Sequence, residues 1–106
     1  MEATYLGLLE ISKLCITTRV TANVSVCKRP CWLVGLIVEP ETIANVTRVY
    51  ARNGESEQAE ILIPYGAQYA QPIHHSVFPV YFNRGLYIDL ETNALSCTVQ
   101  FLEDTT

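Results

Sequence analysis

The last quarter of the chain contains two runs in which apolar and polar residues alternate. Only a pleated strand sends every second side chain to the same face, so each run predicts a strand with one buried face. The segment 91–94 between the runs is short enough for a tight turn, and together the runs predict a β-hairpin. Its expected inward side chains are Leu86, Ile88, Leu90, Cys97, Val99 and Phe101.

Most of the remaining chain has the composition of strands as well, and turn signals recur about every eight to twelve residues. No segment holds the apolar period of an amphipathic helix over several turns. We therefore expect an all-β protein of about eight strands, folded as a single-domain β-sandwich or jelly roll over residues 1–106, with a small barrel as the alternative. The strands expected before the hairpin are 5–11, 16–26, 32–38, 46–52, 61–63 and 77–82.

Three local features predict how these strands are arranged. The segment 32–38 is almost entirely apolar, which is typical of a central strand covered on both faces. Asn53 and Gly54 both tolerate positive φ and predict a hairpin turn, which the polar residues 55–58 lengthen into an exposed loop. Pro79 has no backbone N–H to donate and therefore predicts a sheet edge or a bulge.

The charge and hydropathy of the chain limit its partners. A formal net charge of −4 argues against binding to a phosphate backbone, which needs clustered Lys and Arg. Residues 1–10 lack the basic start of a signal peptide, and the longest apolar run is too short to span a membrane, so we expect synthesis in the cytoplasm and no membrane contact. Because 49% of the residues are hydrophobic and only 17% are charged, we expect apolar surface to meet a partner.

The four cysteines do not match a common zinc or disulfide framework. Three residues separate Cys27 from Cys31, where zinc knuckles usually have two, and no matching second pair exists. Cys97 lies on the expected inward face, where a thiol behaves as a small hydrophobic side chain. Together with Cys15, these residues are expected to be structural thiols. A disulfide or a metal site at Cys27 and Cys31 is the alternative.

The sequence contains no constellation that suggests catalysis. His74 and His75 are adjacent, and neighbouring side chains of an extended segment point to opposite faces, so they do not form a bidentate metal site by themselves. Asp89 is the lone charge between Tyr87 and Leu90 and is expected to be a solvent-facing strand residue or a turn acceptor. We therefore expect no enzyme activity, no cofactor and no metal.

The segment 64–76 holds tyrosine and histidine residues with little periodicity and is expected to be a loop. Tyr65, Tyr69 and His74 lie in this segment, and amphipathic side chains on loops commonly make contacts. A sugar-stacking platform is one alternative for such tyrosines, although contact with protein is the more frequent use.

A series of strand and turn features runs from Trp32 to the end of the chain. It comprises the apolar segment 32–38, the turn at Asn53-Gly54, the Pro-containing segment 77–82, the run Asn83-Arg84-Gly85-Leu86-Tyr87-Ile88-Asp89-Leu90 and the closing segment 96–101. This order resembles a type of small virion protein of tailed bacteriophages, the capsid decoration or cement proteins. The resemblance implies a jelly-roll or β-sandwich fold, no enzyme activity, and binding to the capsid as a homo-oligomer, a dimer or trimer.

The resemblance further implies a structural virion protein that binds the major capsid protein on the outer capsid surface and reinforces joints between capsid subunits. The alternative is a neck, tail or fibre component that acts as a protein- or glycan-binding β module. Residues 1–12, as an extended amino-terminal arm, and the loop 64–76 are expected to reach the partner, since termini and long loops are free of sheet pairing. The expected contact residues are Tyr5, Leu8, Leu9, Tyr65, Tyr69 and His74.

Overall fold

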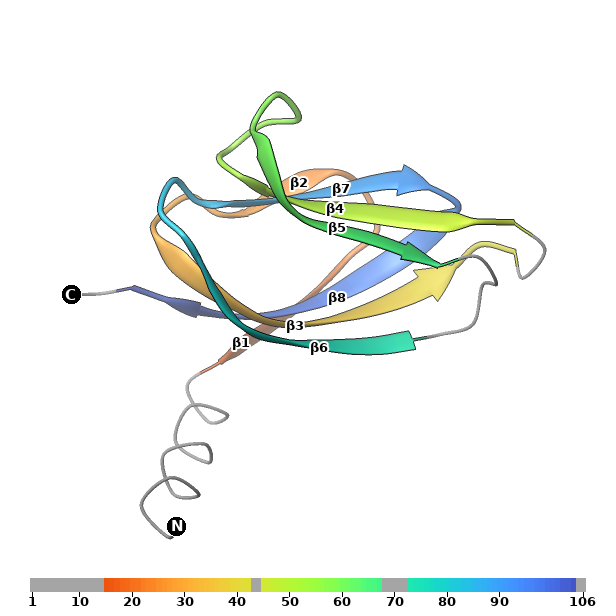
Figure 1. Ribbon diagram of the computed structural model, residues 1–106, viewed down its shortest axis with the longest axis horizontal. Helices are drawn as coiled ribbons and strands as arrows, with labels where there is room; N and C mark the ends of the chain where they lie inside the picture. Colours follow the sequence, from red (N-terminus) through yellow and green to blue (C-terminus); the bar gives the residue numbers. More distant parts are fainter. Residues whose placement is uncertain (1–14, 43–44, 68–72, 105–106) are drawn as a thin grey trace, which may run out of the picture.

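The structure is a computed structural model that describes residues 15–42, 45–67 and 73–104, which form an antiparallel β-sandwich of eight strands (Figure 1). The prediction of an all-β sandwich or jelly roll is confirmed. The strand expected at 5–11 lies outside the described residues. The strands are β1 (Ile16–Val20), β2 (Val24–Cys27), β3 (Cys31–Pro40), β4 (Thr47–Asn53), β5 (Glu60–Ala67), β6 (Ile73–Phe82), β7 (Leu86–Thr92) and β8 (Ala94–Glu103).

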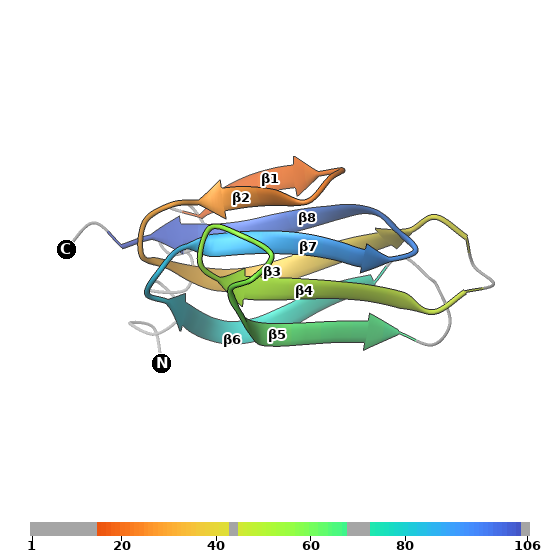
Figure 2. The same cartoon turned by 90° about the horizontal axis from the view of Figure 1, so that it is seen from above.

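The strands pair in a nested order. β1 pairs with β8, β2 with β7, β3 with β6 and β4 with β5, all antiparallel, as in one long hairpin. Additional pairing of β3 with β8 and of β4 with β7 rolls this hairpin up. The result is two stacked sheets with the orders β1-β8-β3-β6 and β2-β7-β4-β5, which is the topology of a jelly roll (Figure 2).

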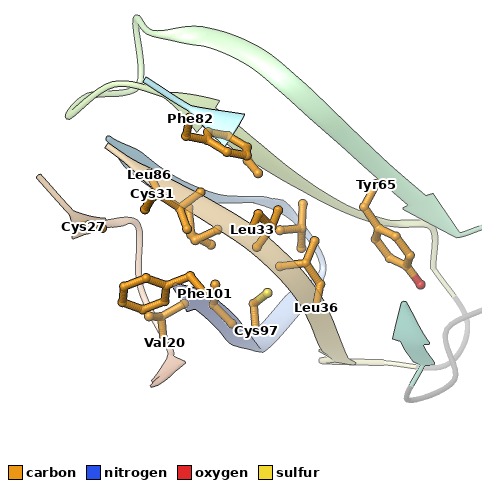
Figure 3. Packing of buried hydrophobic residues seen from close by; sticks show 14 of the residues in the cluster. Val20, Cys27, Cys31, Leu33, Leu36, Tyr65, Phe82, Leu86, Cys97 and Phe101 are labelled. Atoms are coloured by element: carbon orange, nitrogen blue, oxygen red, sulfur yellow. The ribbon is translucent and has the colours of Figure 1, made fainter. Parts of the chain in front are cut away.

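The core lies between the two sheets and receives side chains from every described strand. Figure 3 shows the aromatic rings of Phe82 and Phe101 and the side chains of Leu33 and Leu36 in this space. The six side chains predicted to face inward near the end of the chain do so, with Leu90 partly buried and the others fully buried. The alternation in the sequence therefore identified the buried face of these strands correctly.

The prediction that the last two strands pair as a hairpin is wrong. β7 and β8 lie in different sheets, and the single residue Asn93 between them carries the chain across the sandwich. Their inward faces meet because the sheets stack on each other, not because the strands share hydrogen bonds. Alternation reports which side of a strand is buried, and that side is the same in a hairpin and in an arch between sheets. Among the described strands, β4 and β5 are the sequence neighbours that form a hairpin.

The single strand predicted at 16–26 is in fact two strands of different sheets. β1 ends at Val20, β2 begins at Val24, and the residues between them cross from one sheet to the other. The side chain of Asn23 fixes this crossing, because its Oδ1 accepts a hydrogen bond from the Leu90 amide at 2.7 Å. The alternation runs on through the crossing, so the pattern carried no sign of the break.

β3 has the central position predicted for the segment 32–38, since it lies between β8 and β6. The prediction that both of its faces are covered is wrong. Trp32 and Ile37 have 38% and 37% of their surface exposed, whereas the neighbouring Leu33 and Leu36 are fully buried. A two-layer sandwich covers only one face of each sheet, so the outward residues of even a very apolar strand meet solvent.

The segment predicted as a loop at 64–76 belongs largely to two strands, because β5 continues to Ala67 and β6 begins at Ile73. The prediction from Pro79 is confirmed, since β6 is an edge strand. The register of β6 with β3 also shifts between the pairs Leu33–Val80 and Gly35–Ser76, which leaves Pro79 in an irregular stretch of the ladder. Pro79 has no backbone N–H, but on an edge strand with an irregular register this removes no hydrogen bond from the interior of the sheet.

The connection predicted at Asn53-Gly54 is an exposed loop, as expected, but neither residue has positive φ. Gly54 is required by close approach instead, because a Cβ there would lie 2.6 Å from the Cβ of Ala59. Its amide donates to the carbonyl of Gly85 at 3.1 Å. Gly85 has a φ of 113°, and a Cβ on it would lie 2.7 Å from the Cys27 carbonyl oxygen. The absence of side chains at Gly54 and Gly85 therefore lets the loop after β4 contact the turn before β7.

Asn93 holds the arch between β7 and β8. It has a φ of 52°, in the left-handed region that asparagine tolerates better than most residues. Its Nδ2 donates to the carbonyls of Thr42 and Asn45 and to the hydroxyl of Thr47 at 2.9, 3.2 and 3.2 Å, and its Oδ1 accepts from the Thr42 amide at 3.1 Å. One side chain thus ties the arch to the connection between β3 and β4.

Two substitutions separate the contributions of Asn93. Asn93→Gly removes the side-chain hydrogen bonds, and we expect it to lower the free energy of unfolding by about 1 to 2 kcal/mol. Asn93→Ala also places a Cβ without polar compensation in the left-handed region, which should cost about 1 kcal/mol more. Urea denaturation followed by circular dichroism measures both. Equal losses for the two variants would show that the backbone conformation contributes nothing.

Candidate functional site

The most distinctive surface feature of the described residues is a pair of aromatic side chains on the outer face of the β1-β8-β3-β6 sheet. Trp32 on β3 lies directly opposite Tyr81 on β6. Their ring centroids are 4.6 Å apart with an angle of 43° between the ring planes. Trp32 is 38% exposed and Tyr81 39% exposed, so both rings combine mutual contact with access to solvent.

The pair is continued by Leu102 on β8, which lies opposite Trp32 and is half-buried. We call Trp32, Tyr81 and Leu102 the aromatic patch. The other end of the same sheet face is polar, where an Arg19 Nη2 lies 3.5 Å from Glu39 Oε2 and the Ser96 hydroxyl donates to that oxygen at 3.1 Å. The face therefore divides into an aromatic end and a charged end.

Tyr81 has a defined orientation. Its hydroxyl donates a hydrogen bond to Asp104 Oδ2 at 2.8 Å. This hydrogen bond, together with some burial, raises the pKa of Tyr81 above its ordinary value, so the phenol stays neutral. A ring that is held by a neighbouring ring and by a carboxylate loses little conformational entropy when a partner covers it, and such rigid aromatic side chains are effective contact residues.

Asp89, which was predicted to face solvent, lies on the outer face of the β2-β7-β4-β5 sheet. Asp89 is 3% exposed, so the prediction of a solvent-facing residue is wrong. Arg52 donates to its Oδ2 through Nε at 3.1 Å and approaches it through Nη2 at 3.0 Å, and Asn23 Nδ2 donates to its Oδ1 at 3.2 Å. The third guanidinium nitrogen of Arg52, Nη1, donates to the Ala59 carbonyl at 2.9 Å.

This network has the character of a structural element. Both carboxylate oxygens of Asp89 already accept hydrogen bonds, and Arg52 also lies over the ring of Tyr50, with 5.7 Å from its Cζ to the ring centroid. A buried carboxylate needs such partners because its desolvation is costly. Every group of the ion pair is engaged within the chain, so the network stabilises the sheet rather than offering groups to a ligand.

The cysteines are all free thiols, and Cys27, Cys31 and Cys97 are buried. Cys97 faces the core, as predicted. Burial raises the pKa of Cys97 to about 12 and, with the neighbouring Cys27, that of Cys31 also to about 12. The thiols of Cys31 and Cys97 therefore remain protonated at neutral pH. In the part of the chain that the structure describes, no three His, Cys, Asp or Glu side chains gather as ligands for a metal ion.

Of the predicted contact residues, Tyr65 and His74 lie within the part of the chain that the structure describes. Tyr5, Leu8, Leu9 and Tyr69 lie outside the described residues. Tyr65 is not in a loop but in β5, with only 9% of its surface exposed, and it belongs to the core cluster. His74 is also in a strand, where its backbone in β6 pairs with Ile37 of β3.

The aromatic patch was not predicted from the sequence, although the strand pattern carries a signal for it. Trp32 was placed in a strand covered on both faces. In an antiparallel sandwich, however, neighbours along a strand point to opposite faces, and the buried Cys31 and Leu33 leave Trp32 on the outside. Tyr81 precedes the buried Phe82 in the same way, so alternation within each strand places both rings on the outer face.

No helix in the described residues is long and apolar enough to cross a membrane. No protein-family model matches the chain, and comparison with curated proteins and with solved structures likewise found no similar protein.

Proposed function

We propose that this chain is a structural virion protein that binds the outer surface of a phage capsid and reinforces joints between capsid subunits. The observation that carries the proposal is the exposed, mutually packed pair of Trp32 and Tyr81 on an otherwise regular sheet face. Aromatic residues are enriched in protein interfaces, and tryptophan and tyrosine are over-represented among the residues that contribute most binding energy. The identity of the partner, the major capsid protein, rests on the resemblance to decoration proteins.

The fold suits this role. A jelly roll leaves two broad outer sheet faces, and this architecture is common in viral capsid domains, although a fold alone does not determine a function. A decoration protein adds many identical weak contacts over a shell, and these become collectively strong when copies are linked as a dimer or trimer. A sheet face with a rigid aromatic patch at one end meets that need without a deep pocket.

The proposed amino-terminal arm would extend the same contact. Ile16, at the start of β1, pairs with Phe101, which is next to Leu102 of the aromatic patch. The chain therefore enters the sheet at the end that carries Trp32. Residues 1–12, with Tyr5, Leu8 and Leu9, would be tethered within a few strand widths of about 4.8 Å each from that patch. The arm and the patch can thus serve one interface.

The substitution Trp32→Ala tests the proposed surface. We expect it to weaken binding to capsids at least about 30-fold, which corresponds to a hot-spot loss of about 2 kcal/mol. Ile61→Ala is the matched control, because Ile61 is exposed to a similar extent but lies on the other sheet. Co-sedimentation with capsids assembled from the major capsid protein of the same phage measures binding, and circular dichroism verifies the fold.

Undiminished capsid binding by Trp32→Ala would exclude the aromatic patch from the interface. A protein that leaves the capsids unoccupied but co-purifies with neck, tail or fibre components would support the alternative role. The exposed pair of rings also fits the alternative of glycan binding, because aromatic faces stack on sugars. Retention on host-surface glycans that Trp32→Ala abolishes would favour that function.

A further inference from the structure

Cys27 and Cys31 occupy the point where the chain passes from one sheet to the other. Cys27 is the last residue of β2 and Cys31 the first residue of β3, and these strands belong to different sheets. Only Lys28, Arg29 and Pro30 lie between them. Both cysteine side chains are buried in the core cluster, so each reaches from its own sheet into the shared interior (Figure 3).

The two side chains enter the same core from the two ends of this three-residue crossover. Cys27 is close enough to add to the effect of burial in raising the pKa of Cys31. The Cys27 Sγ also donates to the carbonyl of Arg29 at 3.3 Å, so the crossover curls back over this thiol. The remaining cysteines are placed apart from each other, because Cys97 pairs with Val20 at the end of β1 and Cys15 precedes its start.

We propose that Cys27 and Cys31 form a reversible disulfide that covalently joins the two sheets at the β2–β3 crossover in an oxidising environment. The fold places Cys27 and Cys31 at the two ends of one short crossover, whereas Cys15 and Cys97 lie apart from each other. A protein made in a reducing cytoplasm would carry the dithiol, and the same protein exposed to an oxidising medium would carry the disulfide. This pairing does not depend on the function proposed above.

The chemistry is thiol–disulfide exchange with glutathione disulfide. The thiolate of one cysteine attacks a sulfur of glutathione disulfide, which forms a mixed disulfide and releases one glutathione thiolate. The second cysteine, as its thiolate, attacks the protein sulfur of that mixed disulfide, which closes the Cys27–Cys31 bond and releases the second glutathione. The two protons lost by the protein thiols are taken up by the two glutathione thiolates. The protein loses two electrons, which glutathione disulfide gains.

The native protein should react slowly. Both sulfurs are buried, and burial and the adjacent Cys27 raise the pKa of Cys31 to about 12, which makes its thiolate scarce at neutral pH. The experiment therefore refolds the full chain from guanidinium chloride in buffers that contain glutathione and glutathione disulfide. Unfolding gives the oxidant access to every thiol, so the product reports the preference of the folded chain rather than the accessibility of its cysteines.

Trypsin provides a direct readout, because it cleaves after Lys28, between the two cysteines. After thiol blocking, the disulfide should hold the peptides 20–28 and 29–48 together, and reduction should separate them. The bond Arg29–Pro30 resists trypsin, which keeps the second peptide intact. A variant with Cys15→Ser and Cys97→Ala is the matched control and should give the same linked peptides. Cys31→Ala should give none.

The oxidised protein should also melt about 5 to 10 °C higher than the reduced protein, because a compatible cross-link restricts the unfolded chain. Four free thiols after refolding in the oxidising buffer would overturn the proposal. A disulfide that involves Cys15 or Cys97 in place of the proposed pair, or an oxidised protein that melts below the reduced one, would overturn it as well. None of these outcomes bears on capsid binding by the reduced protein.

Discussion

The substitution Arg52→Ala is expected to lower the free energy of unfolding by about 3 to 5 kcal/mol. It removes the cation that contacts Asp89 at 3.0 Å and leaves that carboxylate almost fully buried with only Asn23 as a side-chain partner. It also removes the hydrogen bond from Arg52 to the Ala59 carbonyl at 2.9 Å, which fastens the β4–β5 loop. Urea denaturation at neutral pH measures the loss.

Two controls distinguish a lost ion pair from a general effect of the substitution. Arg48→Ala removes an exposed arginine from the same strand and should change stability by less than about 0.5 kcal/mol. The double variant Arg52→Leu with Asp89→Leu removes both charges together and should be much more stable than Arg52→Ala, since no uncompensated charge remains. A loss below about 1 kcal/mol for Arg52→Ala would contradict the interpretation of the network as structural.

The substitution Phe101→Ala should lower the free energy of unfolding by about 3 to 5 kcal/mol. The ring is 3% exposed and lies in the core between the sheets, where its removal leaves a cavity (Figure 3). It also sits between two neighbouring strands, because Phe101 pairs with Ile16 of β1 and with Leu33 of β3. Thermal and urea denaturation should therefore show a large and parallel decrease.

Gln100→Ala is the control for that experiment. Gln100 precedes Phe101 on β8 and points to the outer face, so its truncation should cost less than about 0.5 kcal/mol. Similar losses for the two variants would mean that the inward and outward faces of β8 were assigned wrongly. The two residues are adjacent on the same strand and occupy its opposite faces.

The sequence was sufficient to predict the class of fold and the inward faces of the last two strands. Burial selects apolar side chains at every second position, and this selection is visible in residues such as Ile88 and Val99 without any knowledge of their partners. The prediction that Pro79 lies at an edge is equally local, because a missing donor is tolerated only there or at a bulge.

The sequence was not sufficient to predict which strands pair. A short polar connection such as the one at Asn93 serves a hairpin and an arch equally well, and the choice depends on bonds from Asn93 to residues far away in the sequence, Thr42 and Asn45. The burial of Asp89 has the same origin, since Arg52 and Asn23 reach it only once three strands are assembled. Such long-range partners leave no periodic trace.

The candidate site was missed for a related reason. Hydrophobicity does not distinguish a buried residue from an exposed apolar one, and Trp32 is apolar but 38% exposed on the outer face of its sheet. The strands that carry Trp32 and Tyr81 were both anticipated, but their adjacency at opposite positions of β3 and β6 requires the register of the sheet. The segment 64–76, which was expected to be a contact loop, belongs largely to β5 and β6. Tyr65 therefore lies in a strand and is buried in the core.

The nested pairing of the strands has a consequence for how the protein acquires its structure. Of the four nested pairs in the described chain, only β4 and β5 are joined by a short connection, and each pair outward from them, β3–β6, β2–β7 and β1–β8, closes a longer loop. Folding is therefore expected to start in the middle of the chain and to proceed toward both ends, at the slow rate typical of long-range β topologies. During synthesis β1 must wait for β8, so the sheet that carries the aromatic patch can be completed only after Glu103, the last residue of β8, has left the ribosome.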